Sequence, residues 1–161
     1  YGAHVIGLDI DDGKLEKLQQ SGVKHTMNVK GVDPREVKKW IKGVCKEEGY
    51  PAFSHKIFET SGSTPGQELA FSLINFGGQM ATVGFTMDKL KVRLSNLMAF
   101  DAQIKGNWGA SPEVYPEAIQ LYLDGKLNLD DFTELHPLSN INEVIEQAHH
   151  GKLQRRAVLV P

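Results

Sequence analysis

The sequence predicts an α/β fold, with a parallel sheet whose faces are covered by helices. Short apolar segments typical of strands alternate with amphipathic segments typical of helices, at the spacing of βαβ units. Glycine and other small residues gather after the ends of several of these strands. With 161 residues and a 40% hydrophobic content, the chain is long enough to bury a core.

The first three elements follow this alternation. We expect a short strand over residues 5–8, and then a helix striped by Leu15 and Leu18. That helix should stop at Ser21 and Gly22, because glycine readily adopts the left-handed conformation found at helix ends. A weaker strand is expected over 23–29.

The second helix has the clearest start signal in the chain. Asp33 is the expected N-cap, Pro34 takes the first helical position, and Glu36 would complete a capping box. The spacing predicts one apolar face formed by Val37, Trp40, Ile41, Val44 and Cys45. The single cysteine is therefore expected in the core, where it cannot form an internal disulfide.

Three further strands are expected in the middle of the chain, over 56–62, 80–85 and 102–109. Between the first two lies a helix that starts at Thr64 and that Gly77 and Gly78 should end; its apolar residues include Leu69, Leu73 and Ile74.

The last part of the chain should begin with an irregular turn, because Pro112 and Pro116 crowd the start of the next helix. We expect a core-facing stripe on that helix, made of Ala118, Ile119, Tyr122 and Leu123. After Gly125 come a segment over 131–138 that turns from polar to apolar, a helix over 140–150, and a final strand, "RRAVLV".

Composition excludes several classes of partner. The net charge is −2, from 18 basic and 20 acidic side chains without long like-charge runs, which argues against nucleic acid and anionic membranes as partners. The apolar runs are too short for a transmembrane helix, and no secretory signal is visible, so we expect a cytoplasmic protein. The chain enters its first strand after a lead of only a few residues, Tyr1-Gly2-Ala3, without an initiator methionine, and we expect it to be a fragment.

Candidate ligand-binding residues follow the ends of the predicted strands. Ligands of open parallel sheets bind at this edge, where loops and helix N-termini converge. Here the edge carries Asp9, the small residues at 60–62, Gly84, and the glycine-containing segment 106–109. Glycines at such positions serve tight packing as readily as close approach to a ligand.

Asp9 is suited to bind the ribose of a dinucleotide. An acidic residue at the end of the second strand of such a sheet accepts hydrogen bonds from the ribose diol and repels a 2′-phosphate. No arginine follows among residues 10–12, so NAD is favoured over NADP. The alternative is that Asp9 is only a helix N-cap, although Asp11 fits the cap better. The glycine-rich loop G-x-G-x-x-G is absent, and "NFGGQ" at 75–79 stands in the wrong context for it.

Other catalytic patterns are missing. The six histidines and the lone cysteine show no zinc-like spacing, and no nucleophile elbow or phosphate loop is present. Arg155 and Arg156 are either a solvated pair or a clamp on a pyrophosphate.

Five segments together resemble the cofactor-binding half of the zinc-containing medium-chain alcohol dehydrogenases. They are "GAHVIGLDIDDGKLEKLQQSG", "FETSG", "ATVGF", "IKGNWG" and "GKLQRRAVLVP", in the order and spacing of that family. The resemblance implies a Rossmann-type doubly wound sheet that lacks its first strand and glycine-rich loop. It also implies a partial NAD-binding domain over 1–130 and a return segment over 131–161 toward a catalytic domain that is not in the chain.

The resemblance also implies roles for individual residues. Asp9 would bind the adenosine ribose and Lys14 would flank it. Arg155, or Arg156, would meet the pyrophosphate. The other residues implied in NAD binding are Thr60, Ser61 and Gly62, which would line the cleft, and Val83, Gly84, Phe85, Asn107, Trp108 and Gly109, which would hold the nicotinamide carboxamide.

Further expectations come from the family. Zinc is implied, but its ligands would lie outside this chain, so no catalytic or metal-binding residue is assigned and the chain alone should be inactive. Residues 90–100 would pair subunits in a homo-oligomer. The substrate would be a small alcohol. The segment 83–109, together with the ending "RRAVLVP", resembles more narrowly the dehydrogenases that act on an alicyclic hydroxyacyl-CoA. The alternatives are a zinc-free quinone or enoyl reductase of the same family, a nucleotide- or S-adenosylmethionine-binding module without catalysis, and an interaction domain without a ligand.

Overall fold

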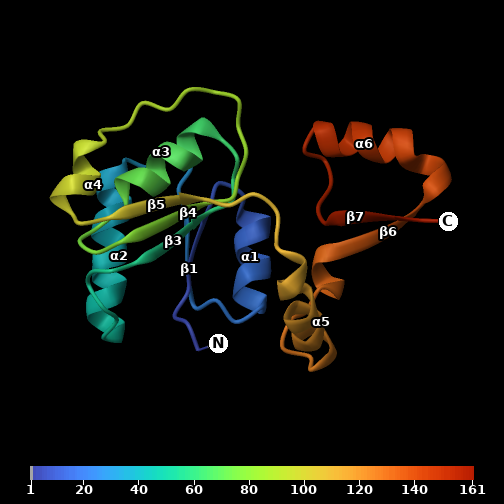
Figure 1. Cartoon of the computed structure of the whole chain (residues 1–161), viewed down its shortest axis with the longest axis horizontal. Helices are drawn as coiled ribbons and strands as arrows, with labels where there is room; N and C mark the ends of the chain where they lie inside the picture. Colours follow the sequence, from blue (N-terminus) through green and yellow to red (C-terminus); the bar gives the residue numbers. More distant parts are fainter. Residues whose placement is uncertain (1) are drawn as a thin grey trace. The chain divides into compact units, whose positions relative to one another are not determined.

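The computed structural model describes residues 2–161, in two units that divide between Trp108 and Gly109 (Figure 1). The elements of the first unit are β1 (Ile6–Asp9), α1 (Asp12–Gln20), β2 (His25–Asn28), α2 (Pro34–Glu48), β3 (Lys56–Glu59), α3 (Thr64–Ser72), β4 (Gln79–Thr82), α4 (Ser95–Ala99) and β5 (Gln103–Gly106). Strands and helices alternate as the sequence predicted.

The strands of the first unit form two parallel groups. β1 pairs with β2, and β3, β4 and β5 form a three-stranded sheet in that order. A Rossmann sheet has the strand order 3-2-1-4-5-6, and it falls into the same groups of two and three when its first strand is left out. The α/β class with parallel sheets is therefore confirmed, and the pairing within each group is that of a Rossmann-type sheet without its first strand.

The middle strands β3, β4 and β5 are shorter than the sequence predicted. β3 ends at Glu59 and β4 at Thr82, so the small residues after them lie in loops. The amides of Val83 and Gly84 both donate to the backbone oxygen of Glu59, each at 2.9 Å, which ends the regular ladder. β5 likewise ends at Gly106.

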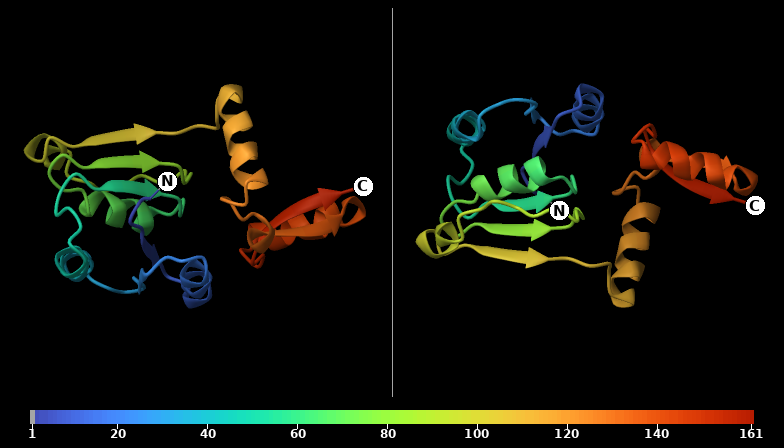
Figure 2. Two further views of the ribbon diagram at one scale, coloured as in Figure 1. Left: turned by 90° about the horizontal axis from the view of Figure 1, so that it is seen from below. Right: turned by 90° about the horizontal axis from the view of Figure 1, so that it is seen from above.

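The core of the first unit lies between α3 and the three-stranded sheet (Figure 2). Ala70, Phe71 and Ile74 from the α3 region pack with Met80 of β4, and all four are buried. On α2, Val37, Val44 and Cys45 are buried, as its apolar stripe predicted. α3 ends at Ser72, earlier than predicted; Gly77 lies in the following turn with φ +65°.

The N-caps of α1 and α2 lie at the residues that the sequence predicted. Asp11 accepts from the amide of Lys14 at 3.1 Å and caps α1, which confirms it rather than Asp9 as the N-cap. Asp33 caps α2, but its carboxylate accepts from the amide of Arg35 at 2.7 Å. In the predicted capping box the Asp33 side chain would accept from the amide of Glu36. This bond is not formed, because the amide of Glu36 donates to the backbone oxygen of Asp33 instead.

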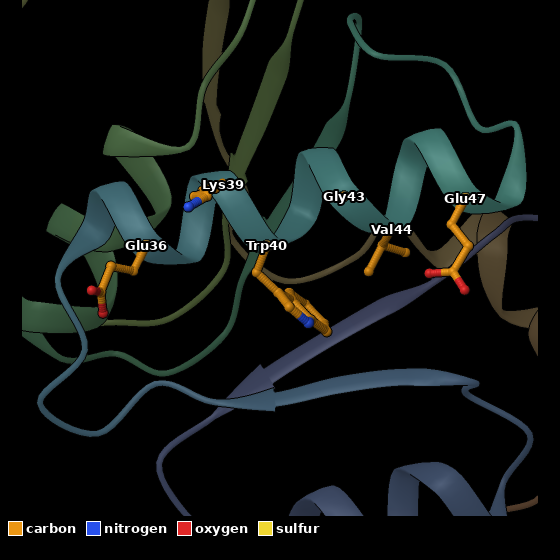
Figure 3. Close-up of a pocket in the computed structure, with 6 residues that line it drawn as sticks. All are labelled: Glu36, Lys39, Trp40, Gly43, Val44 and Glu47. Atoms are coloured by element: carbon orange, nitrogen blue, oxygen red, sulfur yellow. The ribbon is translucent and has the colours of Figure 1, made fainter.

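A hollow of about 460 Å³ runs along α2. Two of its lining side chains, Trp40 and Val44, point toward β1 and β2 (Figure 3). Its lining residues are Glu36, Lys39, Trp40, Gly43, Val44 and Glu47. None of the residues that the sequence assigned to a cofactor lines it.

The second unit contains a βαβ arrangement. Its elements are η1 (Pro112–Val114), α5 (Tyr115–Leu123), η2 (Asp130–Phe132), β6 (Thr133–Pro137), η3 (Leu138–Asn140), α6 (Ile141–His149) and β7 (Arg156–Val160). β6 and β7 are parallel, and α6 connects them and buries Val144. The short η1 before α5 confirms the irregular first turn.

The predicted core stripe of α5 is wrong in this unit. Ile119, Tyr122 and Leu123 are 55%, 41% and 69% exposed, and Ala118 is exposed as well. Within the unit, α6 rather than α5 packs on the two-stranded sheet, so no sheet of this unit covers the apolar face of α5.

Among residues 2–161, no helix is long and apolar enough to cross a membrane.

Candidate functional site

The ends of four strands in the first unit carry the candidate site. Asp9 is the last residue of β1, and residues 60–62, 83–85 and 107–108 follow β3, β4 and β5. The amide of Asn107 donates to Thr82 O at 3.0 Å, and the amides of Val83 and Gly84 donate to Glu59 O. Three successive strand ends are therefore tied together by backbone hydrogen bonds.

Asp9 has an oriented carboxylate with one open oxygen. Its Oδ1 accepts from the amides of Ile10 at 2.7 Å and Asp11 at 3.0 Å, which fixes the side chain at the strand end. Its Oδ2 makes no hydrogen bond with the described residues. Lys14 stands exposed in the first turn of α1. This geometry leaves an acceptor available for a hydroxyl-bearing ligand, whereas the capping role belongs to Asp11.

Asn28 is a neighbour of Asp9 that the sequence reasoning missed. It lies opposite Asp9 in the β1–β2 register. Its Nδ2 donates to Asp12 Oδ1 at 2.6 Å, and its Oδ1 accepts from the amide of Lys30 at 2.9 Å. Asn28 thus connects the loop after β2 to the start of α1, beside the Asp9 carboxylate.

The loops after β3 and β4 cross at two glycines. A Cβ on Gly84 would lie 2.2 Å from the Gly62 amide nitrogen, and a Cβ on Gly62 would lie 2.7 Å from Phe85 O. Gly62 also has φ +61°, which favours glycine. Any side chain at either position would force the loops apart, so both glycines are required for tight packing.

Two buried polar side chains hold this crossing and were also missed. Glu59 and Gln67 are each 4% exposed. Glu59 Oε1 accepts from the amide and the hydroxyl of Ser61 at 2.7 and 2.6 Å, and Gln67 Nε2 donates to Gly84 O at 2.9 Å. An acidic residue in the middle of the strand predicted over 56–62 was the available signal, since buried carboxylates need partners.

Apolar side chains stand open beside these loops. Val83, Phe85 and Trp108 are 46%, 68% and 93% exposed. Exposed apolar side chains that form one contiguous patch are a mark of interaction or ligand-binding sites.

Gly109, Arg155 and Arg156 belong to the second unit. Gly109 has φ +62°, and the two arginines, both exposed, stand just before and at the start of β7. Their roles toward a cofactor stay predictions.

The described residues do not fit a zinc ion. They contain no group of three or more His, Cys, Asp or Glu side chains arranged to hold a metal. Cys45 is 4% exposed, and burial raises the pKa of its thiol. Its Sγ lies 3.8 Å from His55 Nε2, which is itself 2.8 Å from Pro51 O. We therefore treat Cys45 as a core residue.

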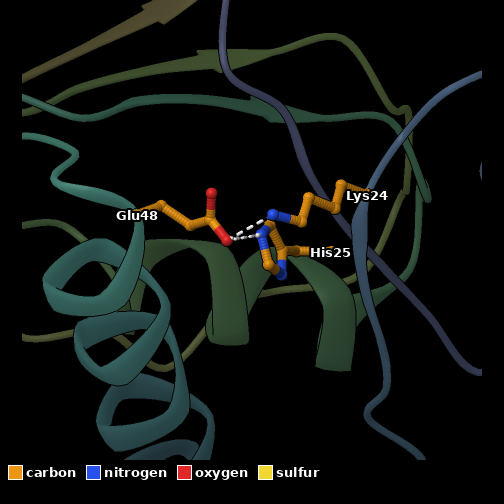
Figure 4. Close-up of polar contacts among 3 residues, drawn as sticks. All are labelled: Lys24, His25 and Glu48. Carbon is orange, nitrogen blue, oxygen red and sulfur yellow. Dashed lines mark hydrogen bonds and ion pairs between the residues drawn. The ribbon is translucent and has the colours of Figure 1, made fainter.

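A polar cluster at the start of β2 has a structural role (Figure 4). Lys24 Nζ and His25 Nε2 lie 2.6 and 3.2 Å from Glu48 Oε1. The hydrogen bond from Lys24 lowers the pKa of Glu48 and raises that of Lys24. The cluster ties β2 to the last turn of α2, at the opposite strand end from Asp9.

Comparison with known proteins agrees with this architecture. Over 98% of its length the chain is 28% identical to alcohol dehydrogenases from Moraxella sp. (strain TAE123) and from Geobacillus stearothermophilus. The chain spans 44% of the length of each. The crystal structure of the alcohol dehydrogenase from Aeropyrum pernix superposes with a TM-score of 0.81 at 22% identity, over 99% of this chain and 43% of that one, and so shares the fold. Residues 1–124 match the zinc-binding dehydrogenase family, and the chain belongs to this family.

Proposed function

We propose that this chain is the NAD-binding portion of an oxidoreductase that oxidises a secondary alcohol by hydride transfer to NAD. The observation that carries the proposal is the Asp9 carboxylate, fixed at the end of β1 through Oδ1 and open at Oδ2. An acceptor in this place suits a ribose diol and disfavours the 2′-phosphate of NADP.

Different described residues would bind different parts of the cofactor. Asp9 would accept hydrogen bonds from the adenosine ribose, with Lys14 beside it. The small residues Thr60, Ser61 and Gly62 would let the cofactor lie close to the backbone. Backbone groups of residues 83–85 and 107–109 would hold the carboxamide, and Arg155 or Arg156 would meet the pyrophosphate. When bound, the nicotinamide ring supplies the hydride-accepting chemistry.

The family implies a zinc ion, whose ligands would be residues outside this chain. The chain's own contribution would be to orient the nicotinamide face toward the alcohol. We also propose a cytoplasmic homo-oligomer that pairs subunits through residues 90–100.

For the substrate we propose an alicyclic hydroxyacyl-CoA, namely 6-hydroxycyclohex-1-ene-1-carbonyl-CoA. Support comes from the segment 83–109, whose sequence resembles 6-hydroxycyclohex-1-ene-1-carbonyl-CoA dehydrogenases of anaerobic aromatic degradation. The test is to compare this thioester with simple secondary alcohols as substrates of the full-length protein. A strong preference for the simple alcohols would refute the substrate while leaving the NAD proposal intact.

Ligand binding by the full-length natural protein tests which cofactor the protein uses. We expect NADH to bind and S-adenosylmethionine not to bind, in parallel calorimetric titrations. A protein that binds S-adenosylmethionine but not NADH would instead be a non-catalytic or methyl-transferring module. Preference for NADPH would favour a zinc-free quinone or enoyl reductase.

A further inference from the structure

We propose that Glu59 is a positioning residue for the nicotinamide half of the NAD site, acting through Ser61 and Gly62. This inference rests on the proposed function. It starts from an unusual observation, a carboxylate that is only 4% exposed at the end of a strand, with one of its two oxygens lacking a hydrogen-bond partner.

The bonded oxygen of Glu59 determines the path of the loop after β3. Oε1 accepts from both the amide and the hydroxyl of Ser61. The Ser61 hydroxyl lies 3.0 Å from that of Ser63, which caps α3 by accepting from the amide of Gly66. One buried carboxylate therefore fixes residues 60–62 between the end of β3 and the start of α3.

The same residue fixes the loop after β4. The backbone oxygen of Glu59 accepts from the amides of Val83 and Gly84. Because Gly62 and Gly84 are in contact, a shift of Ser61 would move Gly62 and transmit to residues 83–85. The loop at 60–62, which would line the cofactor cleft, and the loop at 83–85, which would hold the carboxamide, thus both depend on Glu59.

The unpartnered oxygen argues against a role in filling space. Oε2 faces Gly84, 2.7 Å from where a Cβ would stand, and finds no donor among the described residues. An apolar residue of similar size would fill a buried position at less cost than a carboxylate with an unpaired oxygen. The Glu59 carboxylate therefore acts through its other oxygen, which holds Ser61.

The test compares two ligands on the full-length protein. NADH contains the nicotinamide, whereas ADP-ribose has the same adenosine and pyrophosphate but lacks it. Glu59→Ala should weaken NADH by at least about tenfold, because two charge-assisted hydrogen bonds to Ser61 are lost. ADP-ribose affinity should stay within about twofold, because Asp9 binds that half.

Two further variants sharpen the result. Glu59→Gln keeps an acceptor for Ser61 and should retain NADH affinity within about threefold. Ser61→Ala removes only the hydrogen bond from the hydroxyl, so it provides the same test if Glu59→Ala does not fold. It should weaken NADH binding by about threefold and leave ADP-ribose binding unchanged. Glu16→Ala, at an exposed position of α1, is the matched control and should change neither affinity.

The outcomes separate the two proposals. Equal loss of NADH and ADP-ribose in the Glu59 and Ser61 variants would mean general damage and would overturn the positioning role, as would no loss of either ligand. If the unmodified protein bound neither ligand, the NAD proposal itself would fail, and this inference with it.

Discussion

At the scale of single residues, local hydrogen bonds separate roles that the sequence leaves mixed. Asp9, Asp11 and Asp12 stand together after the first strand. In the structure Asp11 caps α1, Asp12 accepts from Asn28, and Asp9 turns one oxygen to the backbone and leaves the other open. Three similar side chains therefore have three different functions.

Asp9→Ala should weaken NADH binding to the full-length protein by about tenfold or more, because a hydrogen-bonded charged acceptor is removed. NADPH binding should change little or improve, since the repulsion of a 2′-phosphate disappears. Competitive titration of the two cofactors measures both effects. Asp33→Ala, the same chemical change at a distant helix cap, should leave their ratio unaltered; equal losses for both cofactors in Asp9→Ala would contradict the ribose role.

Gly84→Ala should destabilise the protein by about 1–3 kcal/mol or more, because overpacking at a tight contact forces backbone shifts. The added Cβ would stand 2.2 Å from the Gly62 nitrogen. Gly106→Ala is the control, since a Cβ there meets no described atom within 4 Å. Urea denaturation of both variants checks the difference, and equal stability would show that the loops relax without cost.

At the scale of elements, α2 shows how caps and stripes position a helix. Its apolar face and its N-cap are both visible in the sequence, and both are found in the structure. The tie from its last turn to β2, through Glu48, joins residues 24 positions apart and was not visible.

Asp33→Ala should cost about 1 kcal/mol of stability, because the amide of Arg35 loses its acceptor at the N-terminus of α2. Asp33→Asn keeps a capping oxygen and should retain most of that stability. Chemical denaturation gives the comparison. Asparagine as damaging as alanine would show that the charge, rather than the cap, matters.

The Lys24–Glu48 pair should make stability depend on pH at the acid end. Because the folded state lowers the pKa of Glu48 below its ordinary 4.5, the contribution is present above that value and is lost as pH falls through the lower folded pKa. Lys24, whose pKa is raised above 10.5, loses its contribution only as pH rises through its folded pKa. Melting curves of wild type and Lys24→Met should differ at neutral pH and converge in acid. A constant difference across the acid range would contradict this linkage. High salt should reduce the stability difference between the two proteins at neutral pH, because the pair is partly exposed.

At the scale of the whole molecule, the chain spans less than half the length of the proteins it resembles. The described residues offer no metal ligand group, and the family membership rests on residues 1–124. The shared fold extends over 99% of the chain but only 43% of the Aeropyrum pernix enzyme.

We expect residues 1–161 produced alone to show no alcohol oxidation with NAD, even when zinc is added, because the described residues contain no metal-binding group that could polarise the alcohol oxygen. The full-length protein assayed in parallel should form NADH, which absorbance detects. Circular dichroism would first confirm that the shorter chain contains folded helix and strand. Activity of that chain above background would contradict the division of roles.

The sequence by itself determined the α/β class, the order of the elements and their caps, because these depend on local periodicity and on turn and capping chemistry. It also placed Asp9 at the end of a strand, since an acidic residue after a short apolar run can be read directly from the sequence. It did not show the exposed face of α5, because burial depends on which helix packs on a sheet. Only the tertiary structure decided that Glu59, Gln67, Gly62 and Gly84 form one interlocked crossing, since those contacts join residues that are distant in sequence and brought together by strand pairing.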